Sequence, residues 1–468
     1  MSKIKLCGLL FVGSLLSLMT SCLSGNNYDA DDWTLSNAQI ASFSLASESV
    51  DALQNVVFTI DQINGLIFNQ DSMPFRTVLE DKVIATVGFD NPYGVRSIMF
   101  IEGATGDTVQ SVSDSINFSE PVMITVTAYD GISLKMYEAK VNIHQVNPDT
   151  MIWEKYADIL PGKTFQDMKV LKYNDFYYMY VVENSVYQLY RADVPDISNW
   201  EKFELTGFPA KALLSQISTL DNNIFLITES GDLYVSADGQ DWSQVTIDFP
   251  MKTILGYLPA SSITGRNDVL CGVADVDNNL RFITVDNQFV CTLGQTVPAD
   301  FPLSGFGEFH YETMNYPRLV IASGRDSKNN YSNKMWATMD GRDWASLTHP
   351  DFSFSFREGT SAFLYGGTFF IIGGIDETKI PLKDICFSID QGITWFDTYN
   401  VYNEEEEEDE TRYYFPMSEE FEGRGFMSVI VDDDNYVMLF GGKAGNNTNV
   451  LNEIWRGRIN RMGFGKER

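Results

Sequence analysis

Histidine and positive charge are scarce in this 468-residue chain. Its three histidines, His144, His310 and His349, lie far apart in the sequence. Three scattered imidazoles leave little room for a histidine-based metal centre or for a nucleophile activated by histidine. Lysine and arginine together number 33 against 64 aspartates and glutamates, which gives a net charge of −31. Because fixed negative charge repels phosphate, we expect neither nucleic acid nor anionic lipid headgroups as partners.

Cysteine is also rare, and the three cysteines beyond the N-terminal segment do not follow a metal-binding spacing. They are Cys271, Cys291 and Cys386. An odd number argues against a disulfide framework, so we interpret them as buried thiols. A run that begins at Asp275 faintly resembles a calcium loop, but Leu280 stands where such a loop requires glycine, so a hairpin turn is predicted there. We expect no metal and no other cofactor.

Long apolar runs are missing after residue 21, so no later segment is predicted to cross a membrane. The apolar residues 6–18 are too few to span a bilayer and fit a secretory signal, with Lys3 and Lys5 before them. Residues 18–22 (Leu-Met-Thr-Ser-Cys) resemble a bacterial lipobox, which implies a signal peptide over residues 1–21 and lipidation of Cys22. The alternative is an ordinary cleaved signal followed by an incidental cysteine.

Residues 22–36 are predicted to form a polar and acidic tether. Their acidic stretch weakly resembles the export signal of Bacteroidetes outer-membrane lipoproteins. The resemblance implies a lipid-anchored protein of the outer membrane that is displayed on the cell surface, with the periplasmic face as the alternative. The protein would then contact the membrane through its lipid alone.

Residues 37–147 contain short stretches of alternating hydrophobicity separated by turn signals. Strands are predicted at residues 40–45, 56–60, 83–87, 96–101, 122–129 and 137–143. The last two are joined by Asp130-Gly131 and resemble the closing hairpin of cadherin-like or immunoglobulin-like sandwiches, which implies a β-sandwich domain. We interpret this domain as a spacer, with a binding module in its own right as the alternative.

A short motif recurs through the rest of the chain. Residues 388–395 read Ser-Ile-Asp-Gln-Gly-Ile-Thr-Trp and resemble the Asp-box of sialidase-like β-propellers at every fixed position. In such a turn the aspartate caps backbone amides, the glycine adopts a positive φ, and the tryptophan packs between neighbouring sheets. We therefore predict a structural role, not a catalytic one, for the residues of the copies. They are Asp238, Trp242, Asp286, Asp340, Trp344, Asp390 and Trp395.

Paired glycines give a second sign of the same architecture. Gly373-Gly374 and Gly441-Gly442 each follow an apolar strand and precede a polar loop, and this pattern resembles kelch repeats. Counting the strands marked by both motifs predicts a six-bladed β-propeller over residues 151–464, so the predicted fold is all-β. The ring would close by pairing a strand that begins at Trp153 with the last strand of the chain. In the alternative, residues 460–464 supply the closing strand.

One face of this propeller is predicted to be the binding surface, because the connections between blades and the loops between second and third strands share it. The longest of these segments are residues 324–333, 374–383, 398–423 and 442–452. Cations recur just before innermost strands, and if they converge they would bind carboxylate, sulfate or phosphate. The alternative is that each cation pairs with a neighbouring acid or faces water.

Two tyrosines follow an acidic run at residues 404–410 on the same face and could stack on sugar rings or pack inside the protein. The acidic run itself is predicted to be solvated, with capture of calcium or of a basic partner as the alternative. The candidate ligand-binding residues are Lys163, Lys211, Lys252, Arg325, Arg357, Arg424, Tyr413 and Tyr414.

The Asp-boxes invite comparison with sialidases. Those enzymes hold the substrate carboxylate with three arginines, the first of them in an Arg-Ile-Pro-like motif, and use a tyrosine nucleophile. No such motif precedes the first Asp-box of this chain. The Asp-boxes therefore predict blades and do not by themselves predict a hydrolase.

The chain as a whole resembles a family of uncharacterised Bacteroidetes surface lipoproteins, through residues 58–62 and 452–457 among others. The resemblance implies no reaction and no catalytic residues. We expect a surface lipoprotein that is not an enzyme and binds a glycan, or a surface or periplasmic protein, with an anionic ligand among the candidates. The alternative is a carbohydrate-active enzyme that acts on an acidic sugar.

Overall fold

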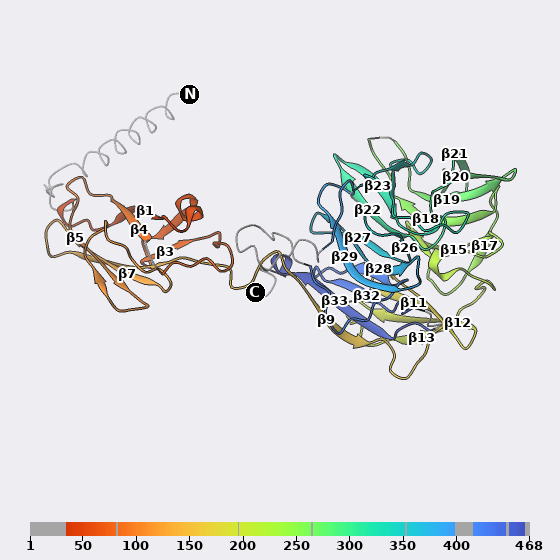
Figure 1. The fold of residues 1–468 in the computed structure, drawn as a ribbon, viewed down its shortest axis with the longest axis horizontal. Coiled ribbons are helices and arrows are strands. Elements are labelled where there is room, and N and C mark those ends of the chain that lie inside the picture. Colours follow the sequence, from red (N-terminus) through yellow and green to blue (C-terminus); the bar gives the residue numbers. More distant parts are fainter. Residues whose placement is uncertain are drawn as a thin grey trace, which may run out of the picture. The chain divides into compact units, whose positions relative to one another are not determined.

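The computed structural model divides into two compact units, Met1–Asn147 and Pro148–Arg468. Both consist of strands joined by turns and short 3₁₀ helices, so the all-β prediction is confirmed (Figure 1). Within the described part of the chain, no helix is long and apolar enough to cross a membrane. The structure describes residues 34–80, 83–194, 196–263, 265–351, 353–397, 415–445 and 449–463. The predicted signal segment, Cys22, most of the tether, the acidic run, Tyr413 and Tyr414 lie outside these residues.

Strands of the first unit form a two-stranded and a six-stranded sheet in its described residues. β1 (Ile40–Ser47) pairs antiparallel with β4 (Val83–Phe89), and η1 (Asp51–Asn55) follows β1. The larger sheet has the order β2-β3-β8-β7-β5-β6. Its strands are β2 (Phe58–Asp61), β3 (Leu66–Asn69), β5 (Val95–Glu102), β6 (Thr108–Val109), β7 (Val122–Ala128) and β8 (Leu134–Lys140).

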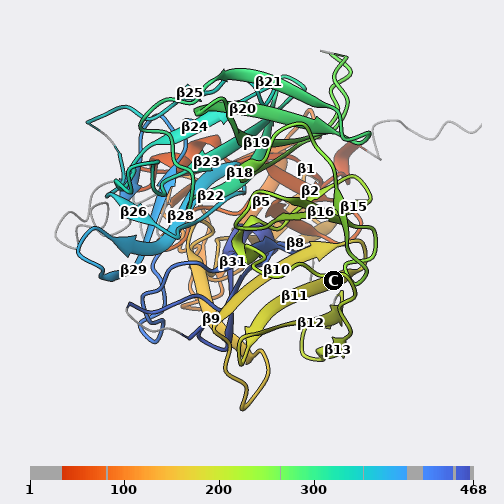
Figure 2. The same cartoon turned by 90° about the vertical axis from the view of Figure 1, so that its right-hand side faces the viewer.

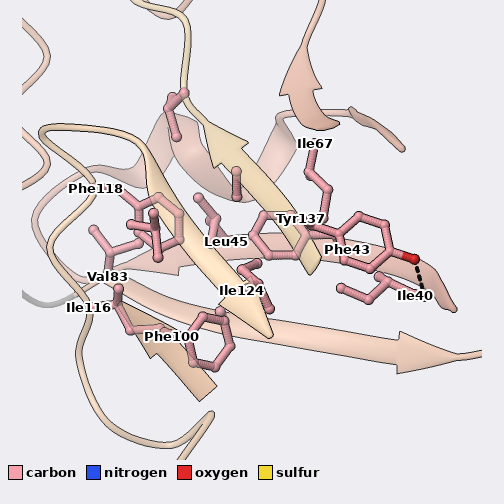
Figure 3. Packing of buried hydrophobic residues seen from close by; sticks show 14 of the residues in the cluster. Ile40, Phe43, Leu45, Ile67, Val83, Phe100, Ile116, Phe118, Ile124 and Tyr137 are labelled. Atoms are coloured by element: carbon pink, nitrogen blue, oxygen red, sulfur yellow. Dashed lines mark hydrogen bonds between the residues drawn. The ribbon is translucent and has the colours of Figure 1, made fainter. Parts of the chain in front are cut away.

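Side chains from both sheets of the first unit share one buried cluster (Figure 3). Buried and half-buried residues alternate along β7, as the period of two in a strand requires. Tyr137 of β8 joins the sheets, because its hydroxyl accepts a hydrogen bond from the Ile40 amide of β1 at 3.0 Å. The same hydroxyl donates to Oε1 of Gln62 at 2.7 Å.

Strands lie at all six predicted places in the first unit, and the predicted hairpin around Asp130-Gly131 is the antiparallel pair β7–β8. The sequence did not reveal β3 and β6. β3 has four residues and pairs parallel with β8, while β6 has only two residues. Strands this short carry too little alternation to be read from a pattern.

The described residues of the second unit form six antiparallel sheets, one of which, β10 to β13, is seen in yellow in Figure 2. Five of the sheets follow one another along the chain. They are β10 (Asp167–Tyr173), β11 (Phe176–Glu183), β12 (Val186–Asp193) and β13 (Glu201–Phe203); β14 (Ser218–Leu220), β15 (Asn223–Ile227), β16 (Leu233–Ser236) and β17 (Ser243–Val245); β18 (Met251–Leu258), β19 (Val269–Val276), β20 (Asn279–Asp286) and β21 (Cys291–Thr296); β22 (Gly307–Thr313), β23 (Tyr316–Ala322), β24 (Met335–Thr338) and β25 (Ala345–Ser346); β26 (Arg357–Glu358), β27 (Ser361–Tyr365), β28 (Thr368–Asp376), β29 (Pro381–Ser388) and β30 (Phe396–Asp397).

The last sheet joins the two ends of the second unit. It has the order β31-β32-β33-β9, and β9 pairs antiparallel with β33 (Figure 1). Its strands are β31 (Ser428–Val431), β32 (Val437–Phe440), β33 (Glu453–Ile459) and β9 (Met151–Asp158). Gly457 lies opposite Trp153, and a Cβ at this glycine would come within 2.5 Å of the indole. The predicted pairing of the Trp153 strand is therefore confirmed, and residues 460–463 form the 3₁₀ helix η3 (Asn460–Gly463).

The innermost strands of the six sheets, with the short helix η2 (Leu214–Gln216), contact one another in a closed series. η2 precedes β14 and takes part in this series. The contacts are β10 with η2, β14 with β18, β18 with β22, β22 with β27, β27 with β31, and β31 with β10. These innermost strands therefore surround a common centre.

Candidate functional site

The predicted Asp-box residues lie in turns between third and fourth strands. Oδ1 of Asp238 accepts hydrogen bonds from the backbone amides of Gln240 and Asp241, both at 2.9 Å. Gly239 has a φ of +77°, and the Trp242 indole donates to its carbonyl at 3.2 Å. Burial alone would raise the pKa of Asp238, but the amide hydrogen bonds outweigh it and lower that pKa. The carboxylate is thus ionised and occupied by its own turn.

Three further aspartates of the motif make the same kind of contact. Each carboxylate accepts backbone amide hydrogen bonds of 2.8 to 2.9 Å, and the three are Asp286, Asp340 and Asp390. Trp344 and Trp395 donate to a glycine carbonyl in their turns at 3.4 and 3.1 Å. These contacts are internal to the turns and leave the aspartates little capacity for a ligand.

Two of the candidate ligand-binding cations are buried arginines. Arg357 precedes β27, and its Nη2 lies 2.7 Å from Oδ2 of Asp384 in β29. Arg424 precedes β31, and its Nη2 lies 2.9 Å from Oε2 of Glu453 in β33. Each guanidinium also donates to backbone carbonyls beside it. Both arginines are therefore fully engaged within their own sheets.

Glu453 holds a second cation besides Arg424. Lys155 of β9 lies 3.1 Å from its Oε1, and the Trp455 indole donates to Oε2 at 3.0 Å. Burial alone would raise the pKa of Glu453, but the hydrogen bonds from Trp455, Arg424 and Lys155 outweigh it and hold that pKa at about 2. This carboxylate stabilises the sheet formed by the two ends of the unit.

The three candidate lysines are exposed. Lys163 pairs with Glu183 at 2.6 Å and Lys211 with Glu229 at 3.3 Å. Lys252 borders a surface cavity of about 360 Å³ that Glu229 and the acidic turn between β19 and β20 also line. Each of the three lysines thus lies near at least one acidic side chain.

The contacts of the five cations fit the alternative given above, in which each pairs with a neighbouring acid or faces water. In the part of the chain that the structure describes, Lys163, Lys211, Arg357 and Arg424 pair with four different carboxylates. None of the five lines the cavity between the innermost strands. The acidic excess accounts for this, because a carboxylate close by neutralises each of these four cations.

Arg325, also predicted as a ligand-binding residue, belongs to a different arrangement. We call Arg325, Tyr331, Glu358 and Lys379 the Tyr331 cluster. The Arg325 guanidinium bonds to the Glu358 carboxylate, donates to the Tyr331 hydroxyl at 2.8 Å, and lies 4.3 Å from the centre of the Tyr331 ring. Lys379 lies 3.4 Å from Oε1 of Glu358 and 5.0 Å from the centre of the Tyr331 ring.

The Tyr331 cluster carries two cations and one carboxylate. The hydrogen bond to Glu358 raises the pKa of Arg325, and the hydrogen bond to Tyr331 raises that of Lys379. Lys379 remains 51% exposed, whereas the side chains of Arg325 and Glu358 are mostly buried. The cluster therefore combines an aromatic ring, a net positive charge and an accessible ammonium group.

A small cavity of about 80 Å³ lies beside this cluster, where innermost strands begin; we call it the channel mouth. Gly305, Gly359 and Phe426 line it, with φ values of +59°, +67° and +61°. A Cβ at Gly305 would lie 3.2 Å from Cβ of Glu358, so Glu358 packs next to one wall of the mouth, whereas none of the four cluster residues lines the cavity itself.

Phe426 is unusual at the channel mouth. A left-handed φ is disfavoured for a bulky aromatic residue and costs free energy that the surrounding structure must supply. Its ring packs against Gly359, where an added Cβ would come within 2.7 Å of it, and the residue is 37% exposed. An aromatic surface is thus fixed at the opening.

Sequence reasoning found Arg325 but missed Tyr331, Glu358, Lys379 and Phe426. The available signal was loop length, because Tyr331 and Lys379 lie in the long segments 324–333 and 374–383. Nothing in a pattern of residue types shows that two such loops meet at one carboxylate.

Neither metal nor thiol chemistry is evident in the described residues. They contain no group of three or more histidine, cysteine, aspartate or glutamate side chains placed to hold a metal ion. Cys271 and Cys386 are buried, Cys291 is half-buried, contrary to our expectation of a buried thiol, and all three are free. Burial raises the pKa of the Cys271 and Cys386 thiols far above the usual range, which leaves them unreactive.

Comparison with known proteins identifies the two units. Residues 34–141 match a family model described as the N-terminal domain of a domain of unknown function, DUF6242, and residues 147–467 match the DUF6242 beta propeller domain. A search of curated proteins found no match. A solved structure named "Structure of YjhT" is 12% identical with a TM-score of 0.42, over 63% of this chain and 95% of that one. The chain thus belongs to the DUF6242 family, with an N-terminal domain followed by a β-propeller.

Proposed function

We propose that this protein is a non-enzymatic surface lipoprotein that binds a glycan or a protein at the channel mouth, through the Tyr331 cluster and Phe426. The observation that carries the proposal is that two cations contact the Tyr331 ring, in a cluster whose Glu358 packs next to Gly305 of the channel mouth. Rings fixed on a rigid scaffold suit stacking on sugar faces or on aromatic side chains.

The proposed scaffold is a six-bladed propeller in which each of the six sheets is one blade. Six sheets, the returning series of contacts between innermost strands, and the β9–β33 pair support this count. We propose that the first unit is an immunoglobulin-like or cadherin-like sandwich that acts as a spacer. Its two sheets around one core support this interpretation. The lipid anchor at Cys22 and the location on the outer membrane remain proposals from the sequence.

A glycan fits the chemistry of the cluster better than a strongly anionic ligand. Glu358 already neutralises one of its two cations, so an anion would meet a carboxylate at the same place. The cluster instead offers donors on Arg325 and Lys379 and an acceptor on Glu358, which is the mixture that sugar hydroxyl groups require. Turnover of an acidic sugar would support the alternative, a carbohydrate-active enzyme.

A glycan array with the purified protein tests the proposal, followed by titration of each hit against variants. Tyr331→Ala and Arg325→Ala should each weaken binding about tenfold or more, because stacking and charge-assisted hydrogen bonds are lost. Lys211→Ala is the matched control, since it removes an exposed, ion-paired cation away from the cluster. If the first two variants bind as the wild type does, the Tyr331 cluster is not the site. Silence on every glycan would direct the search to a protein partner.

A further inference from the structure

The centre of the second unit holds a cavity of about 120 Å³ that we call the channel cavity. Residues of all six sheets, or of the segments that lead into them, line it. It shares Lys169, Gln216 and Thr360 with the channel mouth, so the two form one path inward. A cavity of this size has room for several water molecules or a small polar molecule.

Two residues of opposite charge line this cavity. Among its described lining residues the charged ones are Lys169 of β10 and Glu308 of β22. Burial raises the pKa of Glu308, and Lys169 opposes that rise, so the two groups interact through space. They nevertheless do not form an ion pair with each other, and no described residue forms a hydrogen bond or an ion pair with either side chain.

Both charged residues are half-buried at the cavity wall. Their charges are therefore available to a ligand that enters the cavity, with which each can form a charge-assisted hydrogen bond. Gly256 leaves space for the Glu308 carboxylate, because a Cβ at this glycine would lie 2.4 Å from Oε2 of Glu308.

Gln216 adds a fixed polar group to the same wall. It is 7% exposed, and its Oε1 accepts hydrogen bonds from the Thr253 hydroxyl at 2.8 Å and the Ile254 amide at 2.7 Å. These bonds fix the orientation of the side-chain amide, and no described residue accepts a hydrogen bond from its NH₂ group. Residues that carry a carboxylate, an ammonium group and an amide donor therefore line one cavity.

We propose that the channel cavity binds a small zwitterion, whose ammonium group pairs with Glu308 and whose carboxylate pairs with Lys169 and accepts a hydrogen bond from Gln216. Only a ligand with both charges satisfies both side chains, whereas a simple anion or cation leaves one of them without a partner. The channel cavity shares Lys169 and Gln216 with the lining of the channel mouth, but this proposal uses neither the Tyr331 cluster nor Phe426 and does not depend on the proposed glycan or protein binding.

Calorimetric titration of the purified full chain tests the proposal with glycine, β-alanine and γ-aminobutyrate, which space the two charges at increasing distances. We expect one of the three to bind at a single site. Acetate and methylammonium should bind at least tenfold more weakly than that amino acid. If none of the three amino acids binds, or if a single-charge probe binds equally well, the proposal is wrong.

Two near-isosteric variants locate the site. Glu308→Gln and Lys169→Met should each weaken binding of the best amino acid at least tenfold, while Lys211→Met, an exposed control, should not change it. A crystal soaked with that amino acid gives a second readout that does not depend on the variants. Electron density for it in the channel cavity supports the proposal, and density only elsewhere, or unchanged binding in both variants, overturns it.

Discussion

Arginine and lysine stand at comparable places before innermost strands, yet they differ in what surrounds them. Arg357 and Arg424 are each 1% exposed, whereas the side chains of Lys163 and Lys211 are 44% and 75% exposed. All four have a carboxylate partner within their own sheet, so pairing does not separate the two kinds. The difference is whether the sheet has room to bury the cation.

The paired glycines provide that room. A Cβ at Gly374 would lie 3.3 Å from Cδ of Arg357, and a Cβ at Gly442 would lie 2.9 Å from Cδ of Arg424. Strands β11 and β15, in the sheets that follow Lys163 and Lys211, contain no glycine. Each glycine pair and the buried arginine beside it therefore form one structural feature, and substitution of either residue tests it.

Removal of a buried arginine should have the largest effect. We expect Arg424→Met to lower the free energy of unfolding by about 3–5 kcal/mol, because the variant removes a buried cation that pairs with Glu453 and leaves the carbonyls of Glu422 and Gly441 without their donor. Urea unfolding of the purified protein at neutral pH measures the loss. If the loss is no larger than that of an exposed lysine variant, burial is not what distinguishes the arginines.

Protonation of Glu453 at low pH should also remove the stabilisation that its ion pair with Arg424 provides. Because the pKa of Glu453 is about 2 in the folded protein, against an ordinary value of 4.5, its stabilisation is complete above pH 4.5 and is lost as the pH falls towards 2. The difference amounts to about 3 kcal/mol at neutral pH. Glu453→Gln should thus be less stable than the wild type at pH 7, and most of this difference should disappear at pH 2.5, as measured by thermal unfolding at both pH values. A gap that stays constant with pH would contradict this account.

Adding a methyl group at Gly442 should lower the free energy of unfolding by somewhat less than removing Arg424 does. In Gly442→Ala the new Cβ meets Cγ of Met427 at 2.6 Å and Cδ of Arg424 at 2.9 Å, at a φ of +95°. We expect a loss of about 1–3 kcal/mol in urea unfolding. Gly367→Ala is the matched control, because this glycine has a φ of +81° but no atom within 4 Å of the added Cβ. If both variants lose equally, backbone strain explains the loss and the arginine does not.

The sequence could predict the all-β fold, the β7–β8 hairpin and the pairing of the Trp153 strand, because each depends on residues close together or on a repeated motif. It could not predict the partners of the cations. Asp384 lies 27 residues after Arg357 and Glu453 lies 29 after Arg424, with no pattern linking them. The Tyr331 cluster and the shared cavity of Lys169 and Glu308 are harder still to predict, since each brings together residues of different sheets.

Removal of an exposed lysine should have the smallest effect. Lys211→Met breaks a solvent-exposed pair with Glu229 at 3.3 Å, and such pairs contribute about 0–1 kcal/mol because water screens them. The residue has a φ of +60°, which methionine tolerates no better than lysine, so the change tests the charge and not the backbone. Urea unfolding should place the variant within about 1 kcal/mol of the wild type, with a smaller difference still in 0.5 M salt, the approximate range in which exposed pairs are screened. A loss close to that of Arg424→Met would mean that cations before innermost strands stabilise the ring by long-range attraction to its acidic excess, whether they are buried or exposed.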